Sequence, residues 1–431
     1  MSCIYCFFSK EYQMDLKKKC FGNPKYEETL KEYKELYLSE LQKLDYVRNC
    51  NCIDDIENIL NYDKEKIELY CNYLDDFLDD IKKNIDKVGK YFDYAISIYD
   101  SSIKEGIDSA CNKMSDLIKD KDGWIESIEA VSYSKPLFRI RDKKDKHDKN
   151  DIYNYFHIPF NERFKIGNNR FSASGQPMLY LAGSLQTALV ELGKKIDEVN
   201  VAIFIPKINN NKIYSINNNI EDFIHTGMIS IIKFGSELEY VDILRKGLFS
   251  SIFHNILTFP TNDNTKGNFI QEYALPQLLP NILKKYDAVG IEYRSSKEHK
   301  WKVYDNYVHL LEYNICFFVP YSENSNHNEE FLSQFYYSCD TSRIISINEL
   351  NNALTKLTNY NLLLRNEGYN SYTGLHLVNI KMHIDNMIKY KGDDYYESEE
   401  GKIERTLIYG LINNIIESEN LIEKLMQSLY K

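Results

Sequence analysis

The chain has 431 residues, of which 43% are hydrophobic and 27% are charged, a balance typical of folded rather than disordered proteins. Its formal net charge of −11 argues against nucleic acid as a partner. No stretch approaches about 18 consecutive apolar residues, and the N-terminus lacks a charged start followed by an apolar run, so we expect neither a transmembrane helix nor a secretory signal. The length predicts two or three domains.

The chain has nine cysteines, an odd number, and they are scattered along the sequence. This usage predicts a reducing, cytoplasmic environment. Cys3 and Cys6 form a Cys-x-x-Cys pair, and Cys50 and Cys52 form a second pair with Cys-x-Cys spacing. Two such pairs can bind zinc. Because the second spacing is unusual and the gap between the pairs is long, we favour buried or free thiols over zinc ligands, and no metal is firmly predicted.

Residues 1–130 are predicted to form a helical N-terminal domain. Apolar side chains recur at helical spacing from about Tyr26 to Asp120, and charges of both signs occupy the other faces. No proline interrupts this stretch. The pattern predicts a bundle of about three to five helices without obvious chemistry of its own.

Residues 131–322 mix predicted strands and helices without regular βαβ alternation, which favours an α+β fold. The expected strands cover residues 138–141, 178–182, 199–205, 213–216, 289–293 and 307–318. Helices and connections are expected over 221–257, and a helix with a proline near its first turn over 276–285.

Residues 323–431 are predicted to form a helical C-terminal region behind a polar linker over 321–328. The expected helices cover residues 331–337, 347–364, 375–390 and 403–429. Their apolar stripes should pack on the preceding domain or on a second copy of the chain, so a homo-oligomer is one predicted state.

The densest pattern of the chain is a strand, a turn and a short helix. The strand over 178–182 is short and apolar, Ser184 is the expected N-cap of the helix, and Gly193 its stop. The predicted core stripe of the helix has i, i+3, i+4, i+7 spacing and consists of Leu185, Ala188, Leu189 and Leu192.

Three side chains around this pattern predict a ligand site. Arg170 lies in a polar turn before the strand, Tyr180 lies inside it, and Glu191 borders the apolar stripe of the helix. A guanidinium binds phosphate, an aromatic ring stacks on a planar group, and a carboxylate binds a sugar or a developing positive charge. We therefore expect the three to face one cleft. On spacing alone, a surface cation, a core aromatic and a solvated carboxylate are the more frequent explanation.

The spacing of these three residues, with Leu-Tyr-Leu-Ala over 179–182 and Thr-Ala-Leu-Val-Glu over 187–191, resembles the core motif of the RES-domain family, which comprises toxins of bacterial toxin–antitoxin systems. Further segments that resemble the family pattern follow in the same order at 138–141, 157–160, 272–279, 286–295 and 306–308. The chain departs from that pattern at Arg294, where proline is usual, and in two extra residues before Gly290, which leaves the placing of Ser295 open.

The resemblance implies an ADP-ribosyltransferase-like fold and an enzyme whose substrate is NAD+. Such enzymes break the nicotinamide–ribose bond by phosphorolysis, with inorganic phosphate as a co-substrate, by hydrolysis, or by transfer of ADP-ribose to a protein. Glu191 is expected to stabilise the positive charge on the ribose, Tyr180 to stack on nicotinamide, and Arg170 to bind pyrophosphate or phosphate.

Four further residues are predicted NAD+ ligands: Arg139, Arg141, Ser295 and Asn306. A structural ion pair explains either arginine equally well, and a strand-end turn is the competing role for Ser295. The expected partners are NAD+ and a cognate antitoxin protein, with neither nucleic acid nor membrane. A non-catalytic regulatory protein is the competing function, but the joint presence of Arg170, Tyr180 and Glu191 favours the enzyme.

Overall fold

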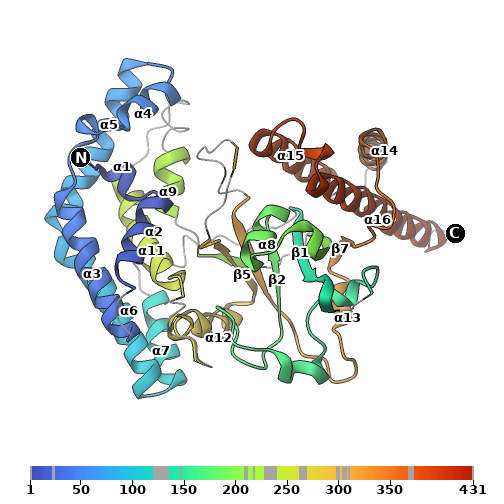
Figure 1. Ribbon diagram of the computed structural model, residues 1–431, viewed down its shortest axis with the longest axis horizontal. Helices are drawn as coiled ribbons and strands as arrows, with labels where there is room; N and C mark the ends of the chain where they lie inside the picture. The colour runs from blue at the N-terminus through green and yellow to red at the C-terminus, as the bar shows by residue number, and fades with distance from the viewer. Residues whose placement is uncertain are drawn as a thin grey trace. The chain divides into compact units, whose positions relative to one another are not determined.

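The computed structural model describes residues 2–21, 25–119, 135–145, 148–207, 212–216, 219–227, 240–261, 269–297, 301–302, 308, 311–366 and 373–429. The chain forms two compact units, which we call unit 1 (residues 1–129, 168–173 and 214–286) and unit 2 (residues 130–167, 174–213 and 287–431). Figure 1 shows the helices and strands and labels them where there is room. The domain boundaries expected near residues 130 and 322 stay a prediction.

Unit 1 is helical. Its helices are α1 (Ile4–Phe7), α2 (Lys10–Lys19), α3 (Tyr26–Lys43), α4 (Ile53–Ile59), α5 (Lys64–Lys83), α6 (Ile85–Lys104), α7 (Ile107–Lys119), α9 (Asn219–Asp222), α11 (Tyr240–Leu257) and α12 (Leu279–Leu283). The expected bundle is confirmed by the five helices α3 to α7 between residues 26 and 119. Aromatic rings fill its core: Tyr37 of α3 lies 5.1 Å from Phe92 of α6, measured between ring centroids.

Unit 2 contains the sheet, apart from residues 214–215, which belong to unit 1. Its strands are β1 (Leu137–Asp142), β2 (Met178–Ala182), β3 (Val199–Pro206), β4 (Lys212–Ser215), β5 (Ala288–Arg294), β6 (Tyr313–Phe318) and β7 (Phe335–Ser338), in the spatial order β4-β5-β6-β2-β1-β3-β7. The pairings β1–β2, β1–β3, β2–β6, β3–β7 and β5–β6 are antiparallel. The α+β fold expected from the sequence is confirmed.

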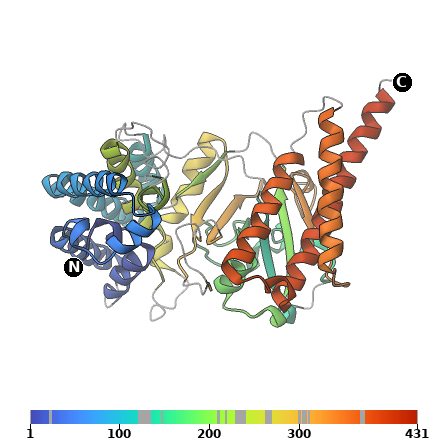
Figure 2. The same cartoon turned by 90° about the horizontal axis from the view of Figure 1, so that it is seen from above.

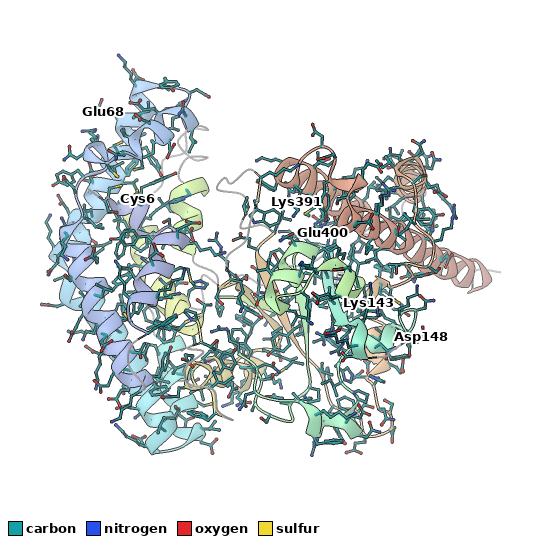
Figure 3. All side chains as sticks on the ribbon, in the orientation of Figure 1. Cys6, Glu68, Lys143, Asp148, Lys391 and Glu400 are labelled. Atoms are coloured by element: carbon teal, nitrogen blue, oxygen red, sulfur yellow. The ribbon has the colours of Figure 1, made fainter. Side chains whose placement is uncertain are left out.

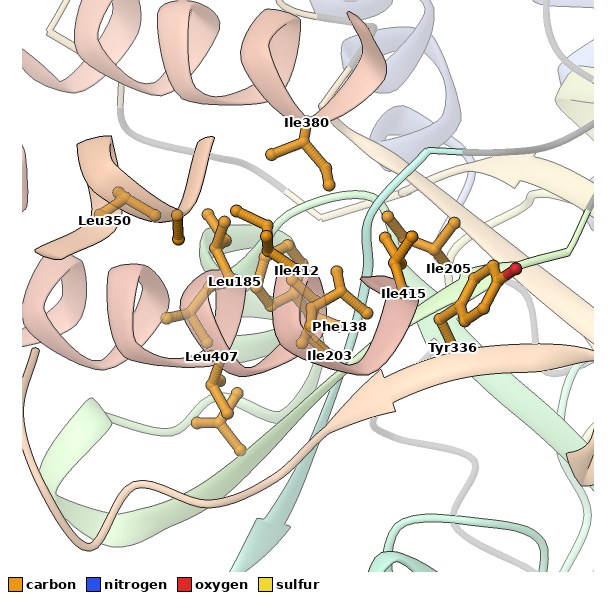
Figure 4. Packing of buried hydrophobic residues seen from close by; sticks show 14 of the residues in the cluster. Phe138, Leu185, Ile203, Ile205, Tyr336, Leu350, Ile380, Leu407, Ile412 and Ile415 are labelled. Atoms are coloured by element: carbon orange, nitrogen blue, oxygen red, sulfur yellow. The ribbon is translucent and has the colours of Figure 1, made fainter. Parts of the chain in front are cut away.

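The two faces of the sheet bury different partners. On one face, Phe138, Ile203 and Ala182 pack with α8 (Leu185–Leu192), α14 (Ile347–Asn366), α15 (Thr373–Lys391) and α16 (Glu399–Leu429). Figure 2 shows the last three helices in orange to red beside the strands, and Figure 4 shows Leu185 of α8 among residues of α16. On the other face, Leu137, Leu179 and Phe317 pack with α13 (Glu329–Leu332). We call the face that bears Phe138, Ile203 and Ala182 the helix-covered face.

One predicted helix is wrong in part. Residues 331–337 were expected to be helical, but α13 ends at Leu332 and residues 335–338 form the edge strand β7. The run Phe335-Tyr336-Tyr337-Ser338 is aromatic, and its residues pair with Pro206 to Ile203 of β3, with Tyr336 on the helix-covered face. Pairing with a neighbouring strand thus outweighs the local helical pattern.

The remaining C-terminal helices are confirmed as α14, α15 and α16. They contribute to the main core, because Leu377, Leu407 and Leu411 are buried against the sheet and α8. Within the described residues, no helix combines the length and the apolarity needed to cross a bilayer.

Candidate functional site

The turn between β2 and α8 is fixed by local chemistry. A Cβ at residue 183 would overlap the ring of Tyr313, so only glycine fits there. Ser184 caps α8, because its hydroxyl accepts a hydrogen bond from the Thr187 amide (3.1 Å). Gly193 ends the helix in the left-handed region at φ 61°. The predicted strand, cap and stop are therefore confirmed.

Helix α8 is also tied to more distant parts of unit 2. The hydroxyl groups of Ser184 and Thr187 donate to the carbonyl of Leu311, at 3.2 and 2.8 Å. On the outer side, Lys391 of α15 donates to Gln186 (2.7 Å) and lies 3.6 Å from Glu400, a pair labelled in Figure 3. These bonds fix the orientation of the helix that bears Glu191.

The core stripe of α8 is one residue shorter than expected. Leu185, Ala188 and Leu189 are buried, but Leu192 is 57% exposed. Leu192 is the last residue of the helix, and the left-handed turn at Gly193 leads the chain away toward β3. The predicted burial of Leu192 is thus wrong, whereas Glu191 lies half-buried at the border of the stripe as expected.

Glu191 accepts a hydrogen bond from a residue of β6 that lies on the same sheet face as Tyr180. Asn314 Nδ2 donates to Glu191 Oε1 at 2.8 Å, and Asn314 itself is buried. Asn314 lies opposite Ala182 in the sheet, while Tyr180 lies opposite Cys316, so Tyr180 and Asn314 are diagonal neighbours on the helix-covered face. Such neighbours are about 7–8 Å apart. A half-buried ring, an amide and a carboxylate therefore occupy one part of unit 2.

Asn314 was missed by the sequence reasoning, which placed the functional asparagine at Asn306. Asn306 lies outside the described residues. The signal for Asn314 is a polar side chain inside an otherwise apolar strand, Tyr313 to Phe318. A buried amide without a partner is costly, so such a residue points to a specific hydrogen-bond partner.

The two arginines of β1 lie on the other face of the sheet, because Arg139 pairs with Ala202 and alternates with Phe138. Arg139 Nη1 donates to the carbonyl of Tyr180 (2.7 Å), and Arg141 Nε donates to the carbonyl of Asn154 (2.8 Å). Burial lowers the pKa of both guanidinium groups. Both arginines thus hold main-chain carbonyls, and their role as phosphate ligands stays a prediction.

Ser295 follows β5 and is buried. Its amide donates to the carbonyl of Glu312 (2.8 Å), and its hydroxyl accepts from the Lys297 amide (3.2 Å). The neighbouring Arg294, which replaces the proline usual in the family, lies 3.7 Å from the buried carboxylate of Glu312. Trp301 Nε1 donates to the same carboxylate (2.9 Å). Ser295 therefore lies at a strand end held by hydrogen bonds, and its role as an NAD+ ligand stays a prediction.

Arg170 belongs to unit 1. Its Nη1 donates to the carbonyls of Leu257 and Phe259, both at 3.0 Å, at the C-terminal end of α11. Its guanidinium lies over the ring of Tyr273, 5.1 Å from the centroid. Gln277 Nε2 donates to the carbonyls of Asn169 and Ser172 in the same turn. Two motif segments that are about 100 residues apart, 169–172 and 272–279, thus meet around this cation.

Arg170 has a cationic neighbour within unit 1. Lys17 is buried, and its Nζ donates to Thr258 Oγ1 (3.4 Å). The pKa of Lys17 is lowered from 10.5 to about 7, mainly by burial and secondly by repulsion from Arg170. The carboxylate of Glu221 acts in the opposite direction and raises the pKa of Lys17, so these cations already have an anionic neighbour in unit 1.

The structure thus places Glu191 against Asn314, a diagonal neighbour of Tyr180 in the sheet of unit 2, and places Arg170 in unit 1. The common cleft of Arg170, Tyr180 and Glu191 stays a prediction.

The histidine of the segment 157–160, His157, is structural. It is fully buried, its Nε2 accepts a hydrogen bond from the Asn328 amide (3.0 Å), and burial lowers its pKa to about 4.

Comparisons with known proteins show which family this chain resembles. The model of the RES domain matches residues 136–215. A protein of Bacillus subtilis (strain 168) named "Putative toxin YopC" is 25% identical to this chain over 289 residues, which cover 63% of the chain and 57% of that protein's length. None of the solved structures matches the chain. The resemblance seen in the sequence is thereby confirmed: residues 136–215 match the RES-domain model, and a toxin-named protein is similar to the chain.

Proposed function

We propose that this chain is an NAD+-consuming enzyme that breaks the nicotinamide–ribose bond and acts as a toxin by depleting NAD+. The observation that supports this most is the orientation of Glu191 by Asn314 on the sheet face that also bears Tyr180. The RES-domain match and the toxin name of the Bacillus relative are consistent with it.

Glu191 acts on the ribose. As the C–N bond breaks, its electron pair leaves with nicotinamide, and positive charge develops on the ribose. A carboxylate oriented before the reaction stabilises that charge without further reorganisation. The bond from Asn314 uses one lone pair of Oε1, so the carboxylate keeps acceptor capacity for the sugar hydroxyls.

Tyr180 and Arg170 bind the two ends of the substrate. The half-buried ring of Tyr180 stacks on the planar nicotinamide and positions it for departure. Arg170 binds pyrophosphate or an incoming phosphate, because its planar guanidinium matches two phosphate oxygens at once.

The acceptor determines the product. With phosphate as the attacking group, the products are nicotinamide and ADP-ribose carrying the phosphate on its ribose. With water, they are nicotinamide, ADP-ribose and a proton. Transfer of ADP-ribose to a protein is the alternative. A cognate antitoxin in the cytoplasm would keep such an enzyme inactive in its own cell.

Product analysis tests this function. The purified full chain is incubated with NAD+ with and without inorganic phosphate, and the products are separated by chromatography. We expect nicotinamide in equal amount to the NAD+ lost. Release that requires phosphate indicates phosphorolysis, release without it hydrolysis, and radiolabel on a protein indicates transfer. A folded chain that releases no nicotinamide under any of these conditions would contradict the proposal and favour the non-catalytic alternative.

A further inference from the structure

The N-terminal cysteines of unit 1 converge although they lie far apart in sequence. Cys3 immediately precedes α1, and Cys6 lies inside it (Figure 3). Cys50 follows the 3-10 helix Val47–Asn49, and Cys52 immediately precedes α4. The four Sγ atoms all lie within 4.8 Å of one another.

The geometry matches four thiolates around one ion. The Sγ atoms of Cys3 and Cys52 are 3.4 Å apart, and those of Cys6 and Cys50 are 3.6 Å apart. A disulfide bond requires about 2.05 Å. Two thiolates on a tetrahedral zinc ion, with Zn–S bonds of about 2.3 Å, are about 3.8 Å apart. The four sulfur atoms are therefore spaced as ligands rather than as disulfide pairs.

The main chain brings the two pairs together. Cys3 and Asp45 form a parallel β-bridge, and the Asp45 amide donates to the Ser2 carbonyl (3.1 Å). The Asp45 side chain accepts from the Tyr46 amide (2.8 Å) and from Asn49 Nδ2 (3.0 Å), which closes the turn before Cys50. The convergence thus follows from a defined backbone turn.

We propose that Cys3, Cys6, Cys50 and Cys52 bind one zinc ion in a closed structural site. Tetrahedral coordination by four sulfur ligands is typical of zinc and of iron, and zinc is the metal of closed structural sites. Cys3, Cys50 and Cys52 are buried and Cys6 is half-buried, so the protein supplies all four ligands and no position is left for substrate. The assignment replaces the free thiols favoured by the sequence spacing.

The ion would cross-link two short segments that are also packed into unit 1, through Ile4 and Phe7 of α1 and Ile56 of α4. Helix α1 has only four residues and α4 only seven, too short to be stable in isolation. Zinc binding would join the N-terminus to the turn that leads into α4, so that metal binding contributes to the folding of unit 1. This inference does not depend on the proposed NAD+ chemistry.

Metal analysis of the full chain tests the site. The chain is produced with added zinc, purified without chelators and analysed by mass spectrometry of the elements. We expect about one zinc ion per chain in the wild type. Cys6→Ser/Cys50→Ser should lose the metal, and Cys71→Ala, a matched control at a fully buried cysteine of α5, should keep it. A wild type without metal, or a double variant that keeps it, would overturn the proposal, and iron in place of zinc would overturn the metal assignment.

Two measurements on the wild type do not require any variant to fold. Before chelation, the four cysteines should be protected from alkylation, and after chelation they should react, as identified by peptide mapping. Replacement of the metal by cobalt should give the visible absorption of tetrahedral cobalt thiolate. Alkylation of these cysteines that is unchanged by chelation, or disulfides linking them in the freshly purified chain, would refute the site.

Discussion

Arg170 in unit 1 and Glu191 in unit 2 are held by different kinds of partner. Arg170 donates to two main-chain carbonyls at the end of a helix, Leu257 and Phe259, which any side chains at those positions would provide. Glu191 accepts from one side chain, the buried Asn314. The hydrogen bonds of the cation thus come from the main chain, with the ring of Tyr273 beside it, whereas the hydrogen bond of the carboxylate depends on the identity of a single residue in another strand.

The largest effect is expected from Glu191→Gln. The substitution keeps the shape of the side chain but removes the charge that stabilises the developing positive charge on the ribose. We expect kcat/KM for nicotinamide release to fall by roughly 10²–10³-fold. Glu330→Gln, at an exposed glutamate of α13, is the control and should not change the rate. Equal rates in the two variants would exclude Glu191 from the reaction.

Arg170→Lys tests whether the guanidinium of Arg170 binds the substrate. Lysine keeps the charge but loses the planar fork, so we expect KM for NAD+ or phosphate to rise roughly tenfold to hundredfold, with a smaller change in kcat. Because Arg170 also bonds the end of α11, the melting temperature of the variant must be measured alongside. Arg163→Lys, at an exposed arginine, is the matched control. A folded Arg170→Lys enzyme with wild-type KM would remove its binding role.

Asn314 tests whether the orientation of the carboxylate matters. Asn314→Ala removes the donor to Glu191 and should lower kcat roughly tenfold. Asn314→Asp places a second carboxylate at this point and should lower it further through repulsion. Asn326→Ala, at an exposed position, serves as the control. If Asn314→Ala and Asn314→Asp were both as active as the wild type, the bond to Glu191 would have no role in catalysis.

The smallest effect concerns stability and its pH dependence. The pKa of Lys17 is about 7 in the folded chain, against an ordinary value of 10.5, with Arg170, Glu221 and Lys10 as its charged neighbours. Between these two values only the unfolded chain binds the proton, so the free energy of unfolding should rise with pH across this window. Lys17→Met should flatten that rise, which chemical denaturation at several pH values will measure. An identical pH dependence in both proteins would show that Lys17 is not buried.

Local signals in the sequence predicted the parts of the site that form locally. Ser184 and Gly193 delimit α8 as expected, and Tyr180 is the half-buried residue of an otherwise buried strand. These features depend on neighbours within a few residues. Leu192 shows the limit of this reasoning, because helical periodicity does not indicate where the sheet beneath the helix ends.

The contacts that join distant segments could not be predicted from spacing. The bond between Asn314 and Glu191 spans 123 positions, and the contact between Cys3 and Cys52 spans 49. Both depend on pairing and turn geometry that a linear pattern does not encode. The strand β7 was misread for the same reason, since its partner β3 lies more than 100 positions earlier.

A crystal structure with an uncleavable NAD+ analogue, in which carbon replaces the oxygen of the nicotinamide ribose ring, tests the central claim most directly. We predict that the nicotinamide ring stacks on Tyr180 and that the ribose lies within hydrogen-bond distance of Glu191, with the bond from Asn314 retained. An analogue bound away from both Tyr180 and Glu191 would contradict the account.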